Sequence, residues 1–485
     1  MPIVTTPAWV KDAVFYQIFP DRFARSSKVL KPNNLEAWDT PPTAAGYKGG
    51  DLYGVLEHLD HLQELGITAI YFNPIFQSAS NHRYHTHDYY QVDPLLGGNA
   101  AFFALRDEMH RRDMKLILDG VFNHASRGNF YFNDILENGK NSAWLDWFTV
   151  HDWPLSAYDG SMPMNYEAWI GLRALPRWNT DNSQVREYLM QVAEYWLREG
   201  IDGWRLDVPF CITSPGFWNE FRTRVKAINP EAYIVGEVWW NATNYLMGDQ
   251  FDAVMNYPLG GAIIQFSGQQ HLVRTERRGE TDWDPYPAIT GDHYAEKAEH
   301  LANKYDWQVV QAQLNLLDSH DTPRLLTMAG GDRATVRLAT ILTMTFPGAP
   351  CVYYGDEIGL PGHHDPDCRR TFPWDNRAGW DMEVFNYHRQ LIVLRKAHRA
   401  LRNGRYVPLY GDQFTVVFAR QNDSETLLVS VNVGDSSQPI TIPLKGLLKD
   451  GTALSALYGS VSGKVEEESL KITLPARDGV ILAAT

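Results

Sequence analysis

The chain has 485 residues, of which 44% are hydrophobic and 21% are charged, so it is a globular protein and not a disordered one. Its formal net charge of −14 argues against binding nucleic acid, which requires clustered basic side chains. A chain of this length has room for about three domains of ~150 residues, although one α/β barrel can use ~250.

Neither the N-terminal residues nor the cysteines indicate secretion or a membrane. The first residues lack a basic lead followed by an apolar stretch and a small-residue cleavage site. No run approaches the ~18 consecutive apolar residues of a membrane span. Cys211, Cys351 and Cys368 are far apart and show no metal-ligand spacing. We therefore expect a cytoplasmic protein with reduced thiols and no membrane association.

Eight short β-rich runs recur through the first three quarters of the chain. Between most of them lie stretches of helical period, such as 55–66 and 185–200, each of which ends at a glycine that suits a helix C-cap. This alternation predicts a (β/α)8 barrel, with a segment between the fifth and sixth strands too short for a long helix. The runs begin at Asp12, Ile67, Lys115, Ile201, Ala232, Phe251, Gln313 and Pro350.

Two further domains are expected. The distance from Lys115 to Ile201 exceeds what a loop and a helix need, and residues 124–172 are rich in Asn, Asp, Gly, Pro and aromatics. We interpret 124–172 as a small domain inserted after strand three, so that the barrel comprises 1–123 and 173–400. Residues 401–485 contain short alternating runs separated by turns, which predict an antiparallel β-sandwich that serves stability and packing.

Four acidic residues stand at the ends of apolar runs: Asp119, Asp207, Glu237 and Asp321. A carboxylate at the end of a buried strand is unusual, because isolated charge is costly away from water. Four of them at corresponding places predict a pocket of carboxylates at one end of the barrel. Such a pocket suits acid/base and nucleophilic chemistry on a sugar linkage.

The neighbours of two of these acids suggest different ionisation states. Arg205 and Asp207 are two apart on one strand, so they share a face, and the guanidinium should keep the carboxylate ionised as a nucleophile requires. A structural ion pair inside the barrel is an equally good interpretation. Glu237 precedes Trp239 and Trp240, and an apolar setting should raise its pKa, which suits a general acid. The two indoles could equally serve packing alone.

The histidines at strand ends have two interpretations. His124 and His320 could donate hydrogen bonds to sugar hydroxyls, although a satisfied structural histidine is the commoner case. The sequence HRYHTHD at 82–88 could be mistaken for a metal site. No acid and histidine recur there at the spacing of helix-borne ligands, so we predict neither a metal nor a cofactor.

Together the motifs resemble the α-amylase family of glycoside hydrolases (family 13). DGVFNH, GWRLDVPF, GEVW and LLDSHDT, in this order, are similar to its four signature regions, and YQIFPDRF, GGDL and FPGAPCVYYGDE extend the similarity over nearly the whole chain. LPRWN at 175–179 and DPDCRR at 365–370 are similar to the subgroup of neopullulanase, cyclomaltodextrinase and maltogenic amylase.

The resemblance implies a role for each site residue. Asp207 would be the nucleophile, Glu237 the general acid and then base, and Asp321 the ligand of the sugar 2- and 3-hydroxyls, while Asp119 would order the site. Hydrolysis would retain configuration, with the Asp207 and Glu237 carboxyls ~5–5.5 Å apart. The remaining sugar contacts would be Tyr84 beneath the ring, His124, Arg205 and His320 around it, Asp365 and Arg369 at the next sugar on the non-reducing side, and Trp239 on the leaving-group side.

Three departures from the subgroup bear on substrate, dimer and metal. The first strand begins near Asp12, without the extra N-terminal β-domain that builds the subgroup's dimer and narrows its active site. The resemblance therefore decides neither cyclodextrin preference nor whether the protein is a monomer or a homodimer. The nucleophile motif continues with Val208-Pro209-Phe210, which lacks the histidine that ligates calcium in true α-amylases. The Asn/Asp-rich calcium loop is replaced by ARSSKVLKPNN, although Gly49 and Asp51 remain.

The sequence thus predicts a hydrolase of α-1,4-linked and some α-1,6-linked glucans, with transglycosylation, whose partner is an α-glucan or maltooligosaccharide. An exo-acting α-glucosidase or glucosyl transferase of the same family is the alternative, and LPRWN separates the two only weakly. A non-catalytic barrel that serves as a binding module is disfavoured, because all three catalytic acids are present.

Overall fold

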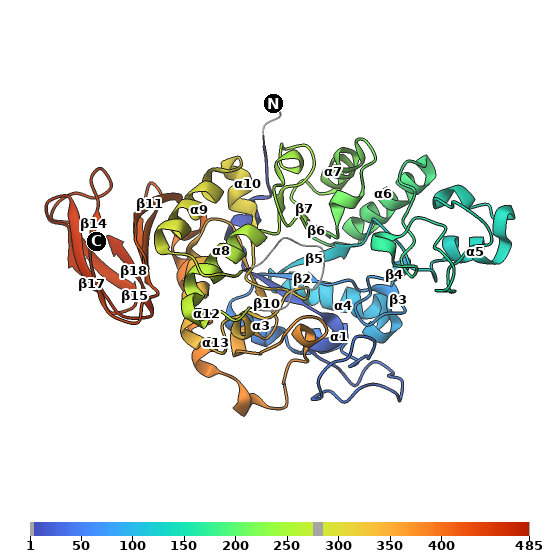
Figure 1. Ribbon diagram of the computed structural model, residues 1–485, viewed down its shortest axis with the longest axis horizontal. Helices are drawn as coiled ribbons and strands as arrows, with labels where there is room; N and C mark the ends of the chain where they lie inside the picture. The colour runs from blue at the N-terminus through green and yellow to red at the C-terminus, as the bar shows by residue number, and fades with distance from the viewer. Residues whose placement is uncertain (1–3, 275–284, 485) are drawn as a thin grey trace.

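The computed structural model describes residues 4–274 and 285–484 and has a (β/α)8 barrel at its centre (Figure 1). Eight parallel strands are hydrogen-bonded in the order β8-β7-β6-β5-β2-β1-β10-β9, and a parallel bridge between Met255 and Leu314 closes the ring. The predicted barrel and its eight strands are confirmed. The strands are β1 (Phe15–Ile18), β2 (Ala69–Phe72), β5 (Lys115–Gly120), β6 (Gly203–Leu206), β7 (Tyr233–Gly236), β8 (Ala253–Val254), β9 (Leu314–Asn315) and β10 (Ala349–Tyr353).

Helices surround the strands, and capping residues mark the ends of several of them. Asn182 accepts hydrogen bonds from the N–H groups of Gln184 and Val185 at the start of α6. Gly66 and Gly200, with φ of 96° and 92°, follow α3 and α6. The larger helices are α2 (Leu52–Glu57), α3 (Leu59–Leu65), α4 (Gly98–Arg111), α6 (Ser183–Arg198), α7 (Phe217–Ile228), α8 (Tyr257–Gly268), α9 (Gly291–Asn303), α10 (Trp307–Ala312), α12 (Arg333–Thr345) and α13 (Met382–Ala397). Short ones are α1 (Pro20–Phe23), α11 (Leu325–Met328) and α14 (Arg399–Asn403).

One predicted helix is two helices in the structure. The periodic stretch 55–66 is interrupted at His58, whose φ of −113° and ψ of 13° separate α2 from α3. The His58 ring bonds to the carbonyl of Gly54 and lies 3.8 Å from the Trp374 ring. This local bond and tertiary contact override the helical period. Between β7 and β8 the chain forms only a single turn, Thr243–Tyr245, as its short length predicts.

The segment after β5 departs from the barrel, at the right of Figure 1. It contains α5 (Phe130–Asn138), and isolated bridges join Phe148 to Trp178 and His124 to Arg177. A hairpin of β3 (Phe76–Ser78) and β4 (Thr86–Val92) after β2 was not predicted. Its polar, histidine-rich sequence lacks the regular alternation that identifies a half-buried strand.

The C-terminal part forms two antiparallel layers, at the left of Figure 1. Side chains from both layers, including Val417, Leu428, Ile440 and Leu470, share one apolar core. The predicted sandwich is confirmed, although two of its strands, β15 and β16, were not predicted. The larger sheet contains β11 (Arg405–Gly411), β12 (Thr415–Gln421), β13 (Thr426–Asn432), β15 (Ala453–Tyr458), β16 (Gly463–Lys464) and β18 (Asp478–Ala484), and the smaller contains β14 (Gln438–Pro443) and β17 (Ser469–Leu474).

Across residues 4–274 and 285–484, no helix combines the length and apolar character needed to cross a membrane.

Candidate active site

The four strand-end acids lie at the carboxyl end of the barrel. Asp119 is the penultimate residue of β5, and Asp207 directly follows β6. Glu237 directly follows β7, and Asp321 lies in the loop after β9. The carboxyl ends of parallel strands meet at one face, which is where barrel enzymes place their chemistry.

Arg205 connects three of the acids. Its Nη1 lies 2.9 Å from Oδ1 of Asp119 and 3.2 Å from Oδ1 of Asp207, and its Nη2 lies 3.0 Å from Oε2 of Glu237. The guanidinium is fully buried, so these charges interact with little screening from water. One guanidinium therefore contacts both carboxyl groups, that of Asp207 through Nη1 and that of Glu237 through Nη2.

Glu237 is fixed through both carboxyl oxygens. Oε2 accepts the backbone N–H of Val208 at 3.0 Å, and Oε1 accepts the indole N–H of Trp239 at 3.2 Å. Burial raises the pKa of Glu237 to about 7, although Arg205 opposes the shift. The predicted rise in this pKa is confirmed, and desolvation is its main cause.

Asp207 requires a correction. The sequence interpretation assigned its ionisation to Arg205 alone, but burial and the neighbouring charge of Glu237 raise the pKa of Asp207 well above its usual range, against Arg205. The two carboxyls therefore titrate as a pair around one guanidinium. In such a pair one proton is retained to higher pH than either isolated acid would allow.

A second ionic group lies around Asp321. Arg369 places Nη2 3.4 Å from Asp321 and Nη1 3.0 Å from Asp365, and its Nε donates to the carbonyl of His320 at 2.9 Å. Burial raises the pKa of Asp321, and Arg369 opposes that rise. The structure thus brings Asp321, Asp365 and Arg369 together, as the resemblance implies.

His320 and Tyr84 form a stacked pair at the centre of a polar network. Their rings are 5.5 Å apart and nearly parallel, and the Tyr84 hydroxyl contacts His320 Nε2 at 2.7 Å and donates to Asp119 at 2.8 Å. Burial lowers the pKa of His320 well below its usual range, so the ring is neutral. The amide Nε2 of Gln17 lies 3.0 Å from His320 Nδ1, so the ring proton is placed on Nε2.

Sequence reasoning missed several members of this network. Gln17 also donates to Asn73, Asn73 donates to the Tyr84 hydroxyl, and Tyr71 donates to Asp119 at 3.0 Å. All three lie on or directly after the first two barrel strands. Polar residues within the runs VFYQIF and AIYFNP were the available signal, because a buried amide on a barrel strand needs a hydrogen-bond partner.

The two remaining predicted sugar contacts are packed against aromatic rings. His124 stacks on Trp169 at 5.5 Å, and burial lowers the pKa of His124 to about 3, so it is neutral at pH 7. Trp239 stacks on Tyr257 at 3.5 Å. Directly beyond it, Trp240 is 45% exposed and lies 4.8 Å from Phe210. The loops that follow Asp207 and Glu237 thus place aromatic rings beside the carboxyl groups of these two residues.

No metal-binding group of three or more His, Cys, Asp or Glu side chains occurs among the residues placed by the structure. Asp51, which the resemblance relates to a calcium loop, is occupied by protein groups. It accepts from the N–H and hydroxyl of Ser26 and from the N–H of Gly54, and the Lys31 ammonium lies 3.0 Å away. An ammonium group therefore supplies the positive charge beside Asp51.

Comparison with known proteins identifies related chains along the full length. Residues 17–381 match the alpha amylase catalytic domain, and residues 404–482 match the alpha-amylase C-terminal domain. Cyclomaltodextrinase of Geobacillus thermopakistaniensis is 40% identical over 98% of this chain and 78% of its own length. Neopullulanase 2 of Thermoactinomyces vulgaris is 41% identical over 99% of this chain and 79% of its own. The crystal structure of a debranching enzyme from Nostoc punctiforme is 54% identical with a TM-score of 0.91, and covers 99% of this chain and 100% of that chain.

Proposed function

Because the chain belongs to the α-amylase family of glycoside hydrolases and is a glycosidase, we propose that it hydrolyses α-1,4 and some α-1,6 glucosidic bonds with retention. The substrates are maltooligosaccharides, cyclodextrins or pullulan, and transglycosylation accompanies hydrolysis. The observation that carries the proposal is the contact of one buried guanidinium, Arg205, with both Asp207 and Glu237. This contact keeps two carboxyls close together, as a double-displacement mechanism requires.

In the first step Asp207 attacks the anomeric carbon and forms a β-glycosyl ester, while Glu237 gives its proton to the departing glycosidic oxygen. A pKa of about 7 leaves about half of the Glu237 carboxyls protonated at pH 7, so the proton is available near neutral pH. In the second step Glu237 removes a proton from water, which attacks the ester, releases Asp207 and yields the α-anomer. A sugar hydroxyl in place of water gives transglycosylation.

The other residues bind the sugars around this bond. Asp321 accepts from the 2- and 3-hydroxyls of the reacting sugar, while His124 and His320 hold the same ring. Tyr84 lies beneath that ring, and its hydroxyl bond to Asp119 fixes its position. Arg369, held by Asp365, binds the next sugar on the non-reducing side. Trp239 lines the leaving-group side and donates its indole N–H to Glu237.

The relatives support α-1,6 cleavage as part of the proposal. The Nostoc punctiforme protein is named a debranching enzyme, and the Thermoactinomyces vulgaris relative is named a neopullulanase. Purified protein should be assayed on β-cyclodextrin, pullulan, starch and maltotriose, with products separated by chromatography. Maltose or glucose from cyclodextrin, with starch much slower, supports the proposal, and faster attack on starch contradicts it. Release of glucose alone from chain ends would instead indicate an exo-acting α-glucosidase.

We further propose that the enzyme works in the cytoplasm. A relative from Bacillus subtilis, 36% identical, is named an intracellular maltogenic amylase. The thiols of Cys351 and Cys368 are buried, and burial raises the pKa of both, so they are poor nucleophiles and fit a reduced state.

A further inference from the structure

Arg324 is a fully buried arginine that takes no part in the chemistry described above. It directly precedes α11 and lies three residues after Asp321. Its guanidinium lies 4.3 Å and 4.8 Å from the ring centres of Tyr353 and Tyr354, and Nη1 donates to the carbonyl of Tyr354 at 2.7 Å. Burial of a charged group is costly unless hydrogen bonds and charges satisfy it, so the partners of this side chain indicate its purpose.

The further partners of Arg324 lie on two other loops at the carboxyl end of the barrel. Nη1 also donates to Oδ1 of Asp356 at 2.9 Å, in the loop after β10. Nε donates to the carbonyl of Cys368 at 2.9 Å, and the backbone N–H of Arg324 donates to the carbonyl of Gly362 at 2.9 Å. Arg324 therefore joins the loop after β9 to the loop after β10 and holds both ends of the segment 362–368.

The end of this segment contacts the substrate-binding residues. Cys368 Sγ donates to the carbonyl of His320 at 3.2 Å, and Arg369 Nε donates to the same carbonyl at 2.9 Å. Arg369 also places Nη2 3.4 Å from Asp321. The strand-end loop that contains Asp321 and the segment that leads into Arg369 are thus joined at the His320 carbonyl and again at Arg324.

A pair of carboxyl groups holds Arg324. Asp356 and Asp318 hydrogen-bond to each other, which two carboxyls can do only when one of them keeps a proton. Burial raises the pKa of both, and that of Asp356 well above its usual range, so the pair retains one proton and one negative charge. Asp318 Oδ2 also accepts the backbone N–H of Leu325 at 2.5 Å. The loop that contains Asp321 is therefore fixed at both of its ends.

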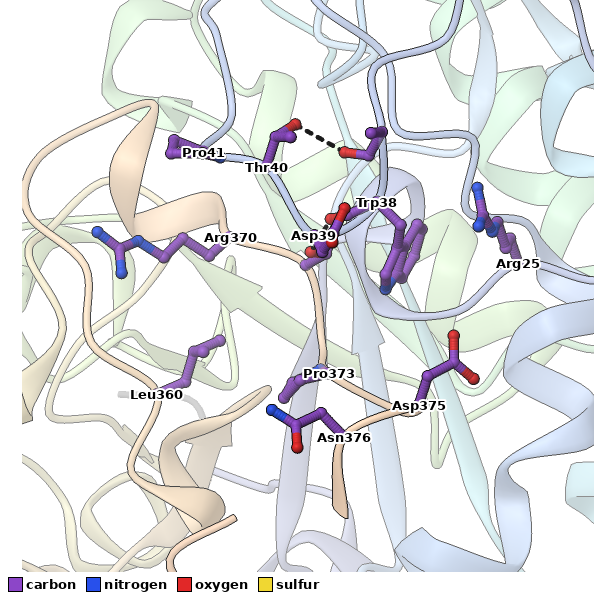
Figure 2. Close-up of a pocket in the computed structure, with 12 residues that line it drawn as sticks. Arg25, Trp38, Asp39, Thr40, Pro41, Leu360, Arg370, Pro373, Asp375 and Asn376 are labelled. Carbon is purple, nitrogen blue, oxygen red and sulfur yellow. Dashed lines mark hydrogen bonds between the residues drawn. The ribbon is translucent and has the colours of Figure 1, made fainter. Parts of the chain in front are cut away.

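A separate attachment lies on the other side of Arg369 in the sequence. The indole N–H of Trp38, in the loop after β1, donates to the carbonyl of Phe372 at 2.9 Å. Figure 2 shows Trp38 and Arg370 on opposite sides of a cavity of about 710 Å³. The position of Arg369 is thus determined from one side by Arg324 and from the other by this bond.

We propose that Arg324 is a positioning residue, which sets the place of Arg369 relative to Asp321. Asp318 and Asp356 support it as a hydrogen-bonded pair that fixes the guanidinium. The inference rests on the proposed function, in which Asp321 binds the reacting sugar and Arg369 binds the next one. Arg324 acts on the substrate through the carbonyl of Cys368 and not by contact.

Two substitutions of Asp356 test the carboxyl pair. Asp356→Ala removes the partner of both Asp318 and Arg324, and should lower kcat/KM for maltohexaose about tenfold, as loss of a hydrogen bond to a charged group would. Asp356→Asn should stay within about twofold of the wild-type value, because an amide can donate to Asp318 and accept from Arg324. Equal losses in the two variants would overturn the proposal.

A double-mutant cycle separates positioning from a general loss of stability. Arg369→Ala removes the side chain that Arg324 places, so Asp356→Ala should cost about tenfold in kcat/KM with Arg369 present but only about twofold in its absence. A loss of stability alone would cost the same factor in both backgrounds. If Asp356→Ala does not fold, Arg324→Lys takes its place in the cycle, since an ammonium cannot reproduce the planar fork that contacts Asp356 and Cys368.

Asp332→Ala is the matched control, because Asp332 makes its bonds to Arg477 and to the N–H of Thr335, outside both loops. It should lower the melting temperature without changing kcat/KM in either background. A cycle in which the two losses simply multiply overturns the proposal. If the wild-type enzyme hydrolyses no α-glucan, the proposed function fails; if it does and the losses multiply, only this inference fails.

Discussion

Val208 donates its backbone N–H to Oε2 of Glu237 at 3.0 Å from a left-handed backbone conformation, with φ of 34° and ψ of 51°. A β-branched residue rarely adopts this conformation, because its Cβ crowds the following carbonyl. Val208 directly follows Asp207, so the unusual turn lets the residue after one acid contact the other. Strain of this kind persists only where the surroundings enforce it, and it gathers at functional sites.

Replacement of this residue tests whether the turn serves catalysis. In Val208→Gly, relief of the left-handed conformation recovers about 1–2 kcal/mol, but loss of a buried valine side chain costs about 1.5–3 kcal/mol. The free energy of unfolding should therefore fall by only about 0.5–1 kcal/mol. The freed backbone should hold Glu237 less well, so kcat should fall several-fold while KM changes little. Denaturant unfolding and steady-state kinetics measure both; an unchanged kcat would mean that the turn has no positioning role.

The pH profile should show the raised pKa values. Glu237 must be protonated to act as an acid, so kcat/KM should decline above about pH 7, where Glu237 loses its proton. Asp207 must be ionised to attack, and because its pKa is also raised, the acidic limb should lie above the usual range of an aspartate. An activated substrate whose leaving group needs no proton should lose the alkaline limb. Persistence of that limb would assign it to another group.

Arg205 should be essential to the fold as well as to the chemistry. Arg205→Ala leaves Asp119, Asp207 and Glu237 buried without their cation, and removal of one partner from a buried ion pair costs about 3–5 kcal/mol. We expect a large fall in melting temperature and no measurable activity. Arg205→Lys should retain the fold better but not the activity, because an ammonium cannot contact three carboxyls with a planar fork. An active lysine variant would contradict this account of the site.

Asp119 should hold neighbouring side chains in place and take no part in the steps that make or break bonds. It accepts from Tyr71, Tyr84 and Arg205 and lies one strand away from Asp207. Asp119→Asn should therefore lower kcat but leave turnover far above that of Asp207→Asn, and the trapped glycosyl-enzyme should still form. If both variants were equally inactive with no trapped ester, Asp119 would have a direct chemical role.

Metal chelation should have no effect. The Lys31 ammonium lies 3.0 Å from Asp51 and also donates to the carbonyl of Leu95 at 2.7 Å, so the charge beside Asp51 is supplied by the chain itself. EDTA should change neither the melting temperature nor the rate. Lys31→Met should lower the melting temperature, with Lys28→Met, at an exposed pair with Glu57, as the control. A chelator-induced fall in melting temperature that calcium reverses would contradict the prediction.

Much of the site could be predicted because its acidic residues lie at the ends of strands that can be recognised in the sequence. Asp119, Asp207, Glu237 and Asp321 each follow an apolar run, and parallel strands must bring those ends together. Gln17, Asn73 and Tyr71 could not be assigned in this way, because their partners are distant in sequence and only the closed barrel brings them near. The division of the predicted helix at His58 depends on Trp374, from the far end of the chain.

The ionisation of Asp207 shows the same limit. Its neighbour Arg205 is visible two residues away, but the burial and the charge of Glu237 that outweigh it arise only from the fold. The hydrogen bond from the Trp38 indole to the carbonyl of Phe372 likewise joins loops more than three hundred residues apart in sequence. The spacing of residues in the sequence indicates which ionisable groups are present. The contacts formed on folding decide the pKa values of those groups and which distant segments lie together.

The central claim is that Asp207 forms the covalent bond to the sugar while Glu237 transfers the proton. The most direct measurement is peptide mapping by mass spectrometry after reaction with a fluorinated α-glucosyl fluoride, which slows hydrolysis of the ester. The account predicts a glycosyl adduct on the peptide that contains Asp207, localised to that residue by fragmentation. An adduct on Glu237 or Asp321 instead would contradict it.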